Sequence, residues 1–197
     1  MLASANQGKL REISALLIGL EIELVTPQQM GLHLDVLEDG TTYAENAARK
    51  ALAYAQVSRL LSLADDSGLE VDALNGLPGL HSARFSPQAG ATDADRRTLL
   101  LQRLESYPRP WQARFHCTVA LATPAGWVGL ADGECPGEII PVERGHSGFG
   151  YDPIFLLAEK GKTMAELRMD EKNQLSHRAR AVRAAIPMIL QQLTIAP

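Results

Sequence analysis

Two adjacent carboxylates follow an apolar run in the first half of this chain. Residues 60–64 read LLSLA, which predicts a buried strand, and Asp65, Asp66, Ser67 and Gly68 come directly after it. A carboxylate beside a core loses hydration, at a cost of several kcal/mol per ion, unless a cation compensates it. We therefore expect a metal ion or a base at the end of this strand. The alternative is a polar turn in which Gly68 takes a positive φ.

The composition excludes several classes of function. The chain has 197 residues, enough for one domain with a sizeable core, and 46% hydrophobic with 21% charged residues is ordinary for a soluble globular protein. A formal net charge of -4 provides no general attraction for nucleic acid, so we expect a small phosphorylated ligand and no nucleic acid polymer. Residues 1–30 carry charges within their apolar stretches, which fits neither a signal peptide nor a membrane span. We expect a cytoplasmic protein, with no membrane association, whose Cys117 is a core residue.

Apolar periodicity predicts intermixed helices and strands, with no linker that would separate domains. The βα order at the start and the hairpins in the middle indicate an α/β protein with a mixed sheet. The expected elements are a strand end at 1–3, a helix from residue 10, a strand at 21–25, a helix opening at Thr42, a half-exposed strand over 69–74, a helix over 92–104, a hairpin over 115–131, a strand over 137–142, a glycine-rich loop over 145–153 and a closing helix from Ser176.

Several polar residues could bind a phosphorylated ligand. Residues 4–9 (SANQGK) form a loop before a helix, where backbone N–H groups would meet an anion. The loop lacks the spacing of a Walker A motif, and an ordinary turn is the alternative. Lys50 lies on a polar helix face, where the alternative is a solvated lysine. Glu38 lies in an acidic loop with no cap to make, whereas Glu45 has the spacing of a capping box with Thr42 and is left out of the metal site.

The segment around residues 145–153 is typical of a shaped binding loop. Its glycines would let the Phe149 ring project against a flat ligand while Asp152 accepts from the ligand's N–H edge, although Phe149 could equally fill a core. His177 and Arg178 begin a helix, where cations oppose the helix dipole. This position suggests an anionic or acceptor-bearing ligand, and a solvated arginine is the alternative.

Together these segments resemble the inosine triphosphate pyrophosphatase family, which hydrolyses non-standard purine nucleoside triphosphates such as ITP, dITP and XTP. The similarity runs almost end to end, although the chain begins closer to the first loop than is usual in the family. The matching motifs, in order, are SANQGK at 4–9, TYAENA at 42–47 with Lys50, ADDSGL at 64–69, GLPG at 76–79, SARF at 82–85, FHC at 115–117, GFGYDPIF at 148–155, Lys172 with Asn173, and Ser176 to Arg178. Each motif is short, but their order at the family's spacing makes the signal specific.

The resemblance implies a fold and an activity. The fold is α/β, with a long mixed, twisted β-sheet flanked by helices, in a single catalytic domain over residues 1–197 whose two lobes enclose the active-site cleft. The activity is a Mg²⁺-dependent nucleoside-triphosphate pyrophosphohydrolase, which cleaves the triphosphate to monophosphate and pyrophosphate and so cleanses the nucleotide pool. A homodimer is implied as well.

The resemblance also assigns roles to residues. Asp66 is implied as the base that activates a metal-bound water, and Glu38, which fits better than Asp39, joins Asp66 as a metal ligand. Lys9 and Lys50 are expected near the phosphates. The implied substrate-binding residues are Ser4, Ala5, Asn6, Gln7, Gly8, Lys9, Lys50, Ser67, Phe149, Gly150, Tyr151, Asp152, Lys172, His177 and Arg178.

Three other functions remain open at this stage. A related family acts on dTTP and UTP, but its opening loop has arginines that residues 4–9 lack. A nucleotide sensor would keep the base pocket without needing Asp66. An RNA-binding module would need a basic face and stacked aromatics, whereas only 5% of this chain is aromatic.

Overall fold

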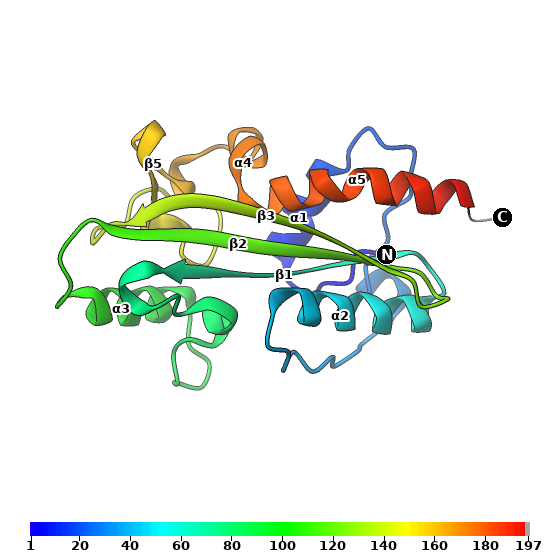
Figure 1. Ribbon diagram of the computed structural model, residues 1–197, viewed down its shortest axis with the longest axis horizontal. Coiled ribbons are helices and arrows are strands. Elements are labelled where there is room, and N and C mark those ends of the chain that lie inside the picture. Colours follow the sequence, from blue (N-terminus) through cyan, green and yellow to red (C-terminus); the bar gives the residue numbers. More distant parts are fainter. Residues whose placement is uncertain (196–197) are drawn as a thin grey trace. The chain divides into compact units, whose positions relative to one another are not determined.

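The strands form one sheet whose order follows the chain. The computed structural model describes residues 1–195, and within them the order is β1-β2-β3-β4-β5, with antiparallel pairing (Figure 1). A parallel bridge outside these strands joins Leu2 to Leu63. The predicted combination of helices and strands is therefore confirmed, whereas the five strands form an antiparallel sheet and not the mixed sheet that was expected. The strands are β1 (Ser62–Val71), β2 (Trp111–Ala122), β3 (Val128–Ile139), β4 (Phe155–Leu157) and β5 (Lys162–Thr163).

The main helices begin at residues whose side chains cap them. Asn6 Oδ1 accepts from the Lys9 N–H at 3.1 Å, and Thr42 Oγ1 accepts from the Glu45 N–H at 3.1 Å. The Glu45 carboxylate accepts from the Thr41 N–H, so only half of the predicted capping box with Thr42 forms. The helices are α1 (Gln7–Leu16), α2 (Tyr43–Ser58), α3 (Asp93–Leu104), α4 (Met169–Leu175) and α5 (His177–Ile195). Short 3₁₀ segments are Gln28–Met30, Asp72–Leu74, Gly79–Arg84, Asp152–Ile154, Ala158–Lys160 and Met164–Glu166.

Several predicted boundaries were wrong. The strand expected to end at Ala64 continues as β1 to Val71, so Gly68 lies within a strand and takes no positive φ. Residues 21–25 form no strand, although Val25 O accepts a hydrogen bond from the Leu2 N–H. The strand expected over 137–142 is the end of β3, which stops at Ile139. The main reason is that paired partners allow a strand to carry polar residues, which a pattern of apolar residues does not reveal.

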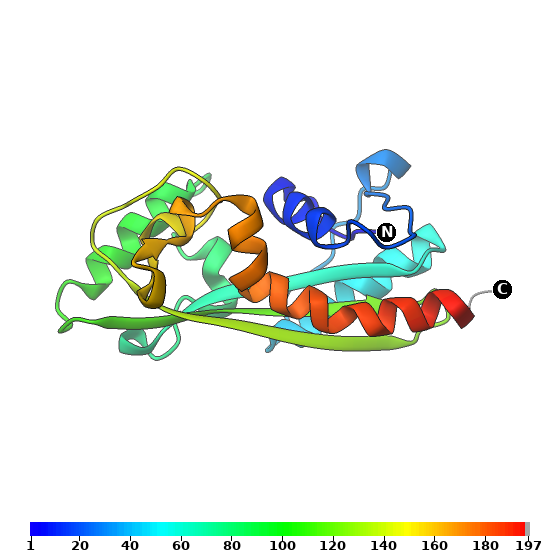
Figure 2. The same ribbon diagram turned by 90° about the horizontal axis from the view of Figure 1, so that it is seen from above.

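One compact unit consists of Met1–Asp66, Cys117–Gly133 and the chain from His177 onward. Within it α1 lies beside α5 (Figure 2), and Ile13 packs in a cluster with Val119 and Ala185. A second cluster joins the alanines of α2 to those of β1 and β2, because small side chains let the helix approach the sheet closely. The predicted core position of Cys117 is confirmed, since its exposed fraction is 0%.

The other compact unit consists of Ser67–His116 and Glu134–Ser176. Its core includes Leu69, Leu100 and Phe155, and the Phe155 ring centroid lies 4.4 Å from that of Phe115. Among the helices that the structure describes, none is long and apolar enough to cross a membrane. The active-site cleft between two lobes stays a prediction.

Candidate active site

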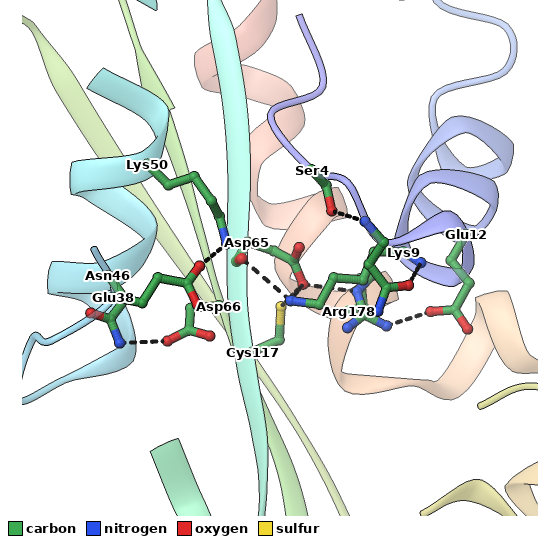
Figure 3. A network of polar contacts seen from close by, with 11 residues as sticks. Ser4, Lys9, Glu12, Glu38, Asn46, Lys50, Asp65, Asp66, Cys117 and Arg178 are labelled. Carbon is green, nitrogen blue, oxygen red and sulfur yellow. Dashed lines mark hydrogen bonds and ion pairs between the residues drawn. The ribbon is translucent and has the colours of Figure 1, made fainter. Parts of the chain in front are cut away.

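Asp65 and Asp66 occupy the middle of β1 and lie on its opposite faces. Consecutive side chains of a strand alternate between faces, and Figure 3 shows Asp66 toward Asn46 of α2 and Asp65 toward Arg178. Both carboxylates are buried, with exposed fractions of 0% for Asp65 and 8% for Asp66. The two faces have different chemistry.

Asp66 is held by a neutral partner. Asn46 Nδ2 donates to Asp66 Oδ2 at 2.9 Å, and Asn46 Oδ1 accepts from the Gly40 N–H at 2.8 Å. A Cβ at Gly40 would lie 2.6 Å from Asn46 Oδ1, so glycine permits this close approach. Burial raises the pKa of Asp66, although the Asn46 hydrogen bond and the charges of Lys9 and Lys50 oppose the rise. A carboxylate with a raised pKa is a better proton acceptor than an ordinary aspartate.

Lys50 is paired with Glu38. Lys50 Nζ lies 2.5 Å from Glu38 Oε1, and the Lys50 side chain is only 13% exposed. Burial alone would lower the pKa of Lys50, but the charges of Asp65, Glu38 and Asp66 outweigh it and raise the pKa. Lys50 is therefore a charged, partly buried group, and the solvated alternative was wrong.

Asp65 lies in a cluster of buried charges. Arg178 Nε donates to Asp65 Oδ2 at 3.0 Å and Arg178 Nη1 to Glu12 Oε2 at 2.5 Å, while Lys9 Nζ lies 3.1 Å from Asp65 Oδ2 (Figure 3). Burial would raise the pKa of Asp65, but the positive charges of Lys9, Arg178 and Lys50 outweigh it and hold the pKa well below its usual range. Asp65 is thus ionised at neutral pH and ties α1 and α5 to β1.

The loop 4–9 turns around its own side chains. Ser4 Oγ accepts from the Asn6 N–H at 3.2 Å, and Ala5, Asn6 and Gln7 are exposed. A cavity of ≈ 470 Å³ adjoins this loop, and its described lining includes neither Asp66 nor Glu38. The lining residues are Ser4, Ala5, Gln7, Leu10, Thr26, Pro27, Gln28, Leu32, His33, Leu34, Asp35 and Tyr54.

The residues expected to bind the base and sugar divide between the two units. In the unit that contains the glycine-rich loop, Lys172 Nζ lies 2.5 Å from Asp152 Oδ2 and 5.3 Å from the Phe149 ring centroid. Asp152 Oδ2 also accepts from the Phe149 N–H at 3.0 Å. A Cβ at Gly148, where φ is +80°, would overlap Asp152 Oδ2, so the loop requires glycine there. Phe149, Asp152 and Lys172 therefore form one cluster.

The other residues predicted to bind the base and sugar are buried or half-buried. The Tyr151 ring lies in the core and its hydroxyl donates to Ser82 O at 2.9 Å, which leaves mainly its backbone for a ligand. Ser67 follows Asp66 in β1 and is half-buried. His177 and Arg178 do begin α5, but both are buried. For Arg178, the internal partners Asp65 and Glu12 account for a cation at this helix start without any ligand.

The sequence reasoning missed two residues of these networks. Asn46 lies four residues before Lys50 on α2, a spacing that puts both on one helix face, and this could have indicated its position. Glu12 lies three residues after Lys9, on α1, and its burial depends on Arg178, which is 166 positions away in the sequence. No local signal predicts such a pair.

The donor set near Asp66 suits a hard divalent cation. Within the described residues, no three or more His, Cys, Asp or Glu side chains are grouped so that they could hold a metal ion. Mg²⁺ usually binds through one or two protein carboxylates together with substrate phosphates and water. Asp66 and Glu38, whose charge contributes to raising the pKa of Asp66, are the two carboxylates that could bind such an ion.

These features define an α/β protein whose candidate active site contains the buried carboxylate of Asp66 and the Glu38–Lys50 ion pair. The chain belongs to the Ham1 family, whose pattern matches residues 1–188. It is 48% identical to the dITP/XTP pyrophosphatase of Geobacter sulfurreducens, over 92% of each chain, and 43% identical to that of Desulfotalea psychrophila, over 98% of this chain and 87% of the relative.

Solved structures agree with this assignment. A HAM1 protein from Coxiella burnetii superposes with a TM-score of 0.86 at 40% identity, covering 97% of both chains. A nucleoside-triphosphatase / dITP/XTP pyrophosphatase from Mycobacterium abscessus gives a TM-score of 0.73 at 41% identity, covering 94% of this chain and 97% of that one. The resemblance found in the sequence motifs is confirmed.

Proposed function

We propose that this protein is a nucleoside-triphosphate pyrophosphohydrolase that converts ITP, dITP and XTP to the monophosphate and pyrophosphate. The names of the relatives support the reaction class and the substrate class. The observation that carries the proposal is the environment of Asp66, a buried carboxylate with a raised pKa beside Lys50 and Glu38. A group of this kind can take a proton from a water near a triphosphate.

The reaction forms a bond between water oxygen and the α-phosphorus and breaks the bond from that phosphorus to the bridging oxygen. Asp66 would accept the proton of the attacking water, held in position by Asn46. Lys9 and Lys50 would balance the charge that develops on the leaving pyrophosphate. Without substrate, Lys9 is paired with Asp65 and Lys50 with Glu38. On substrate binding, each lysine would exchange its carboxylate partner for phosphate oxygens.

Mg²⁺ would be held by Glu38 and Asp66 together with the phosphates. Once Lys50 contacts a phosphate, Glu38 is available as a ligand. When bound, the metal would neutralise the triphosphate and lower the pKa of a coordinated water. The side chains of the protein would position the water and the leaving group.

Base selection would depend on hydrogen-bond donors. Hypoxanthine and xanthine present an oxygen at position six where adenine presents an amino group, so donors aimed at that atom are left unpaired by adenine, at about 1–3 kcal/mol each. His177, Arg178 and N–H groups of the glycine-rich loop are the proposed donors, with Phe149 against the base and Lys172 and Asp152 beside it. Ser67 and the loop 4–9 would contact the phosphates and sugar.

One assay tests the proposal. Pyrophosphate release is measured from ITP, XTP, dTTP and GTP with and without Mg²⁺, and we expect rapid release from ITP and XTP only when Mg²⁺ is present. Preference for dTTP would favour the related pyrimidine-acting family, and no release from any nucleotide would favour a sensor. The homodimer and the cytoplasmic location stay predictions, and light scattering at assay concentration tests the former.

A further inference from the structure

The glycine-rich loop is held from outside by the start of α3. Asp93, the first residue of α3, accepts from the Gly150 N–H with Oδ2 at 2.7 Å, and Arg97, one turn later, donates from Nη1 to Gly150 O at 2.8 Å. Both polar groups of one glycine are thus bound by side chains of one helix, which lies beside the loop (Figure 2). Hydrogen bonds to ionised groups are stronger than those between neutral groups.

Arg97 is itself fixed in this position. Its Nε and Nη2 donate to the two oxygens of Glu143 at 2.8 and 3.0 Å, and its side chain is 12% exposed. A bidentate pair with a carboxylate restrains the guanidinium plane and so directs Nη1. Arg97 therefore bridges Glu143, before the loop, and Gly150, within it.

Asp93 is anchored as well. Its other oxygen, Oδ1, accepts from Arg96 Nη1 at 2.8 Å, and Arg96 Nε donates to Ala83 O at 2.9 Å. The first turn of α3 is in addition closed by the capping box of Thr92 and Asp95. The two side chains that bind Gly150 thus project from a well-defined helix start.

The loop needs such support because of its composition. Gly145, Gly148 and Gly150 all have φ between +62° and +81°, and glycine loses more backbone freedom on ordering than any other residue. A loop that is mobile before binding is ordered by its ligand, and that cost is subtracted from affinity. Gly150 lies between Phe149 and Asp152, so holding its peptide groups also holds the residues proposed to contact the base.

We propose that Asp93 and Arg97 are positioning residues that pre-organise the glycine-rich loop for the nucleotide base. We call the two contacts from Asp93 and Arg97 to Gly150 the clamp. The clamp affects binding of the base and leaves the chemical step at Asp66 unchanged. This inference deepens the proposed function and rests on it for the identity of the ligand.

The kinetic test compares Arg97→Ala with a matched variant of the same helix. We expect Arg97→Ala to raise KM for ITP about tenfold, equivalent to about 1.4 kcal/mol, while kcat stays within about twofold. Arg97→Lys, which retains a donor for Gly150 O, should recover part of the loss. Arg103→Gln is the control, because the Arg103 guanidinium lies 4.5 Å from the Phe85 ring centroid instead, and its KM should equal that of the parent. An unchanged KM in Arg97→Ala, or a lower kcat at unchanged KM, would overturn the proposal.

A second test needs no substrate. Hydrogen exchange over residues 143–152 is measured in the free protein, and both Asp93→Ala and Arg97→Ala should exchange faster than the parent and the Arg103→Gln control. The double variant should be little worse than either single one, because both remove support from the same peptide unit. Parent-like exchange in the variants would overturn the clamp. If the parent releases no pyrophosphate from ITP, the proposed function is wrong. Hydrogen exchange over residues 143–152 still shows whether Asp93 and Arg97 hold the loop.

Discussion

The two faces of β1 give identical side chains opposite electrostatic settings. On one face Asp65 meets Lys9 and Arg178, and its pKa is lowered; on the other face Asp66 meets a neutral amide, and burial raises its pKa. Environments that push the pKa values of neighbouring carboxylates apart indicate different roles. Asp65 has the setting of a structural charge and Asp66 that of a proton acceptor.

Buried charge affects stability differently on the two faces of β1. A buried ion pair adds little net stability, because desolvation offsets the attraction, but removal of one partner leaves an uncompensated charge. The cluster of Asp65, Arg178 and Glu12 is therefore expected to be sensitive to single substitutions, whereas at Asp66 the neutral amide of Asn46 donates the hydrogen bond.

The largest expected effect is on activity at Asp66. Asp66→Asn keeps an oxygen acceptor for Asn46 but cannot take a proton, so pyrophosphate release from ITP should fall about 10²–10⁴-fold. The free energy of unfolding should change little or increase, because a costly buried charge is removed. Steady-state kinetics and urea denaturation measure both. An Asn variant with parental kcat would remove Asp66 from the mechanism.

The matching substitution on the other face should act on stability. Asp65→Asn removes the carboxylate that Lys9 and the buried Arg178 share and leaves Arg178 with Glu12 alone, so we expect the free energy of unfolding to fall by about 3–5 kcal/mol. Asp39→Asn is the control, since the Asp39–Arg49 pair is largely exposed and should contribute no more than about 1 kcal/mol. Urea denaturation followed by circular dichroism measures both. Equal, small losses would mean that the Asp65 cluster is no more important than a surface pair.

The pH dependence of stability should have opposite signs for the two carboxylates. In the unfolded chain the pKa of Asp65 is about 3.9, and in the folded state it is lower. Asp65 therefore stabilises the folded state above about pH 3.9, and this stabilisation is lost as the pH falls below that value. The pKa of Asp66 is raised in the folded state, so the protein loses stability as the pH rises from about 3.9 through that raised pKa. Denaturation of the parent and of each Asn variant across pH 3–8 checks the signs. Parallel curves for both variants would contradict the contrast.

The smallest expected effect concerns the amide that holds Asp66. The Asn46 hydrogen bond favours the ionised carboxylate, so Asn46→Ala should raise the pKa of Asp66 further and move the acidic limb of the rate profile to higher pH. The rate at low pH should fall a few-fold, as for loss of one hydrogen bond of about 1 kcal/mol. Gln56→Ala, at an exposed position of α2, is the control. An acidic limb that does not move would show that Asn46 serves only to hold Gly40.

Local signals in the sequence were sufficient for α1, α2, α3 and α5, but did not predict α4. The helix starts near Thr42 and Thr92, the alternation that gives the β2–β3 hairpin, and the glycine-rich loop were predicted, because each depends on neighbours within a few positions. The ordered motifs also identified the family. These are properties of short segments, which the chain carries before it folds.

The resemblance singled out Asp66, but only the tertiary structure gave the physical reason that separates the two aspartates. The sequence predicted that both followed the end of a strand, whereas β1 continues through them and turns their side chains to opposite faces. The partners of Asp65 come from positions 9 and 178, and Glu12 completes the cluster from α1. Burial and long-range charge set the pKa of each carboxylate, and neither quantity exists until distant segments pack together.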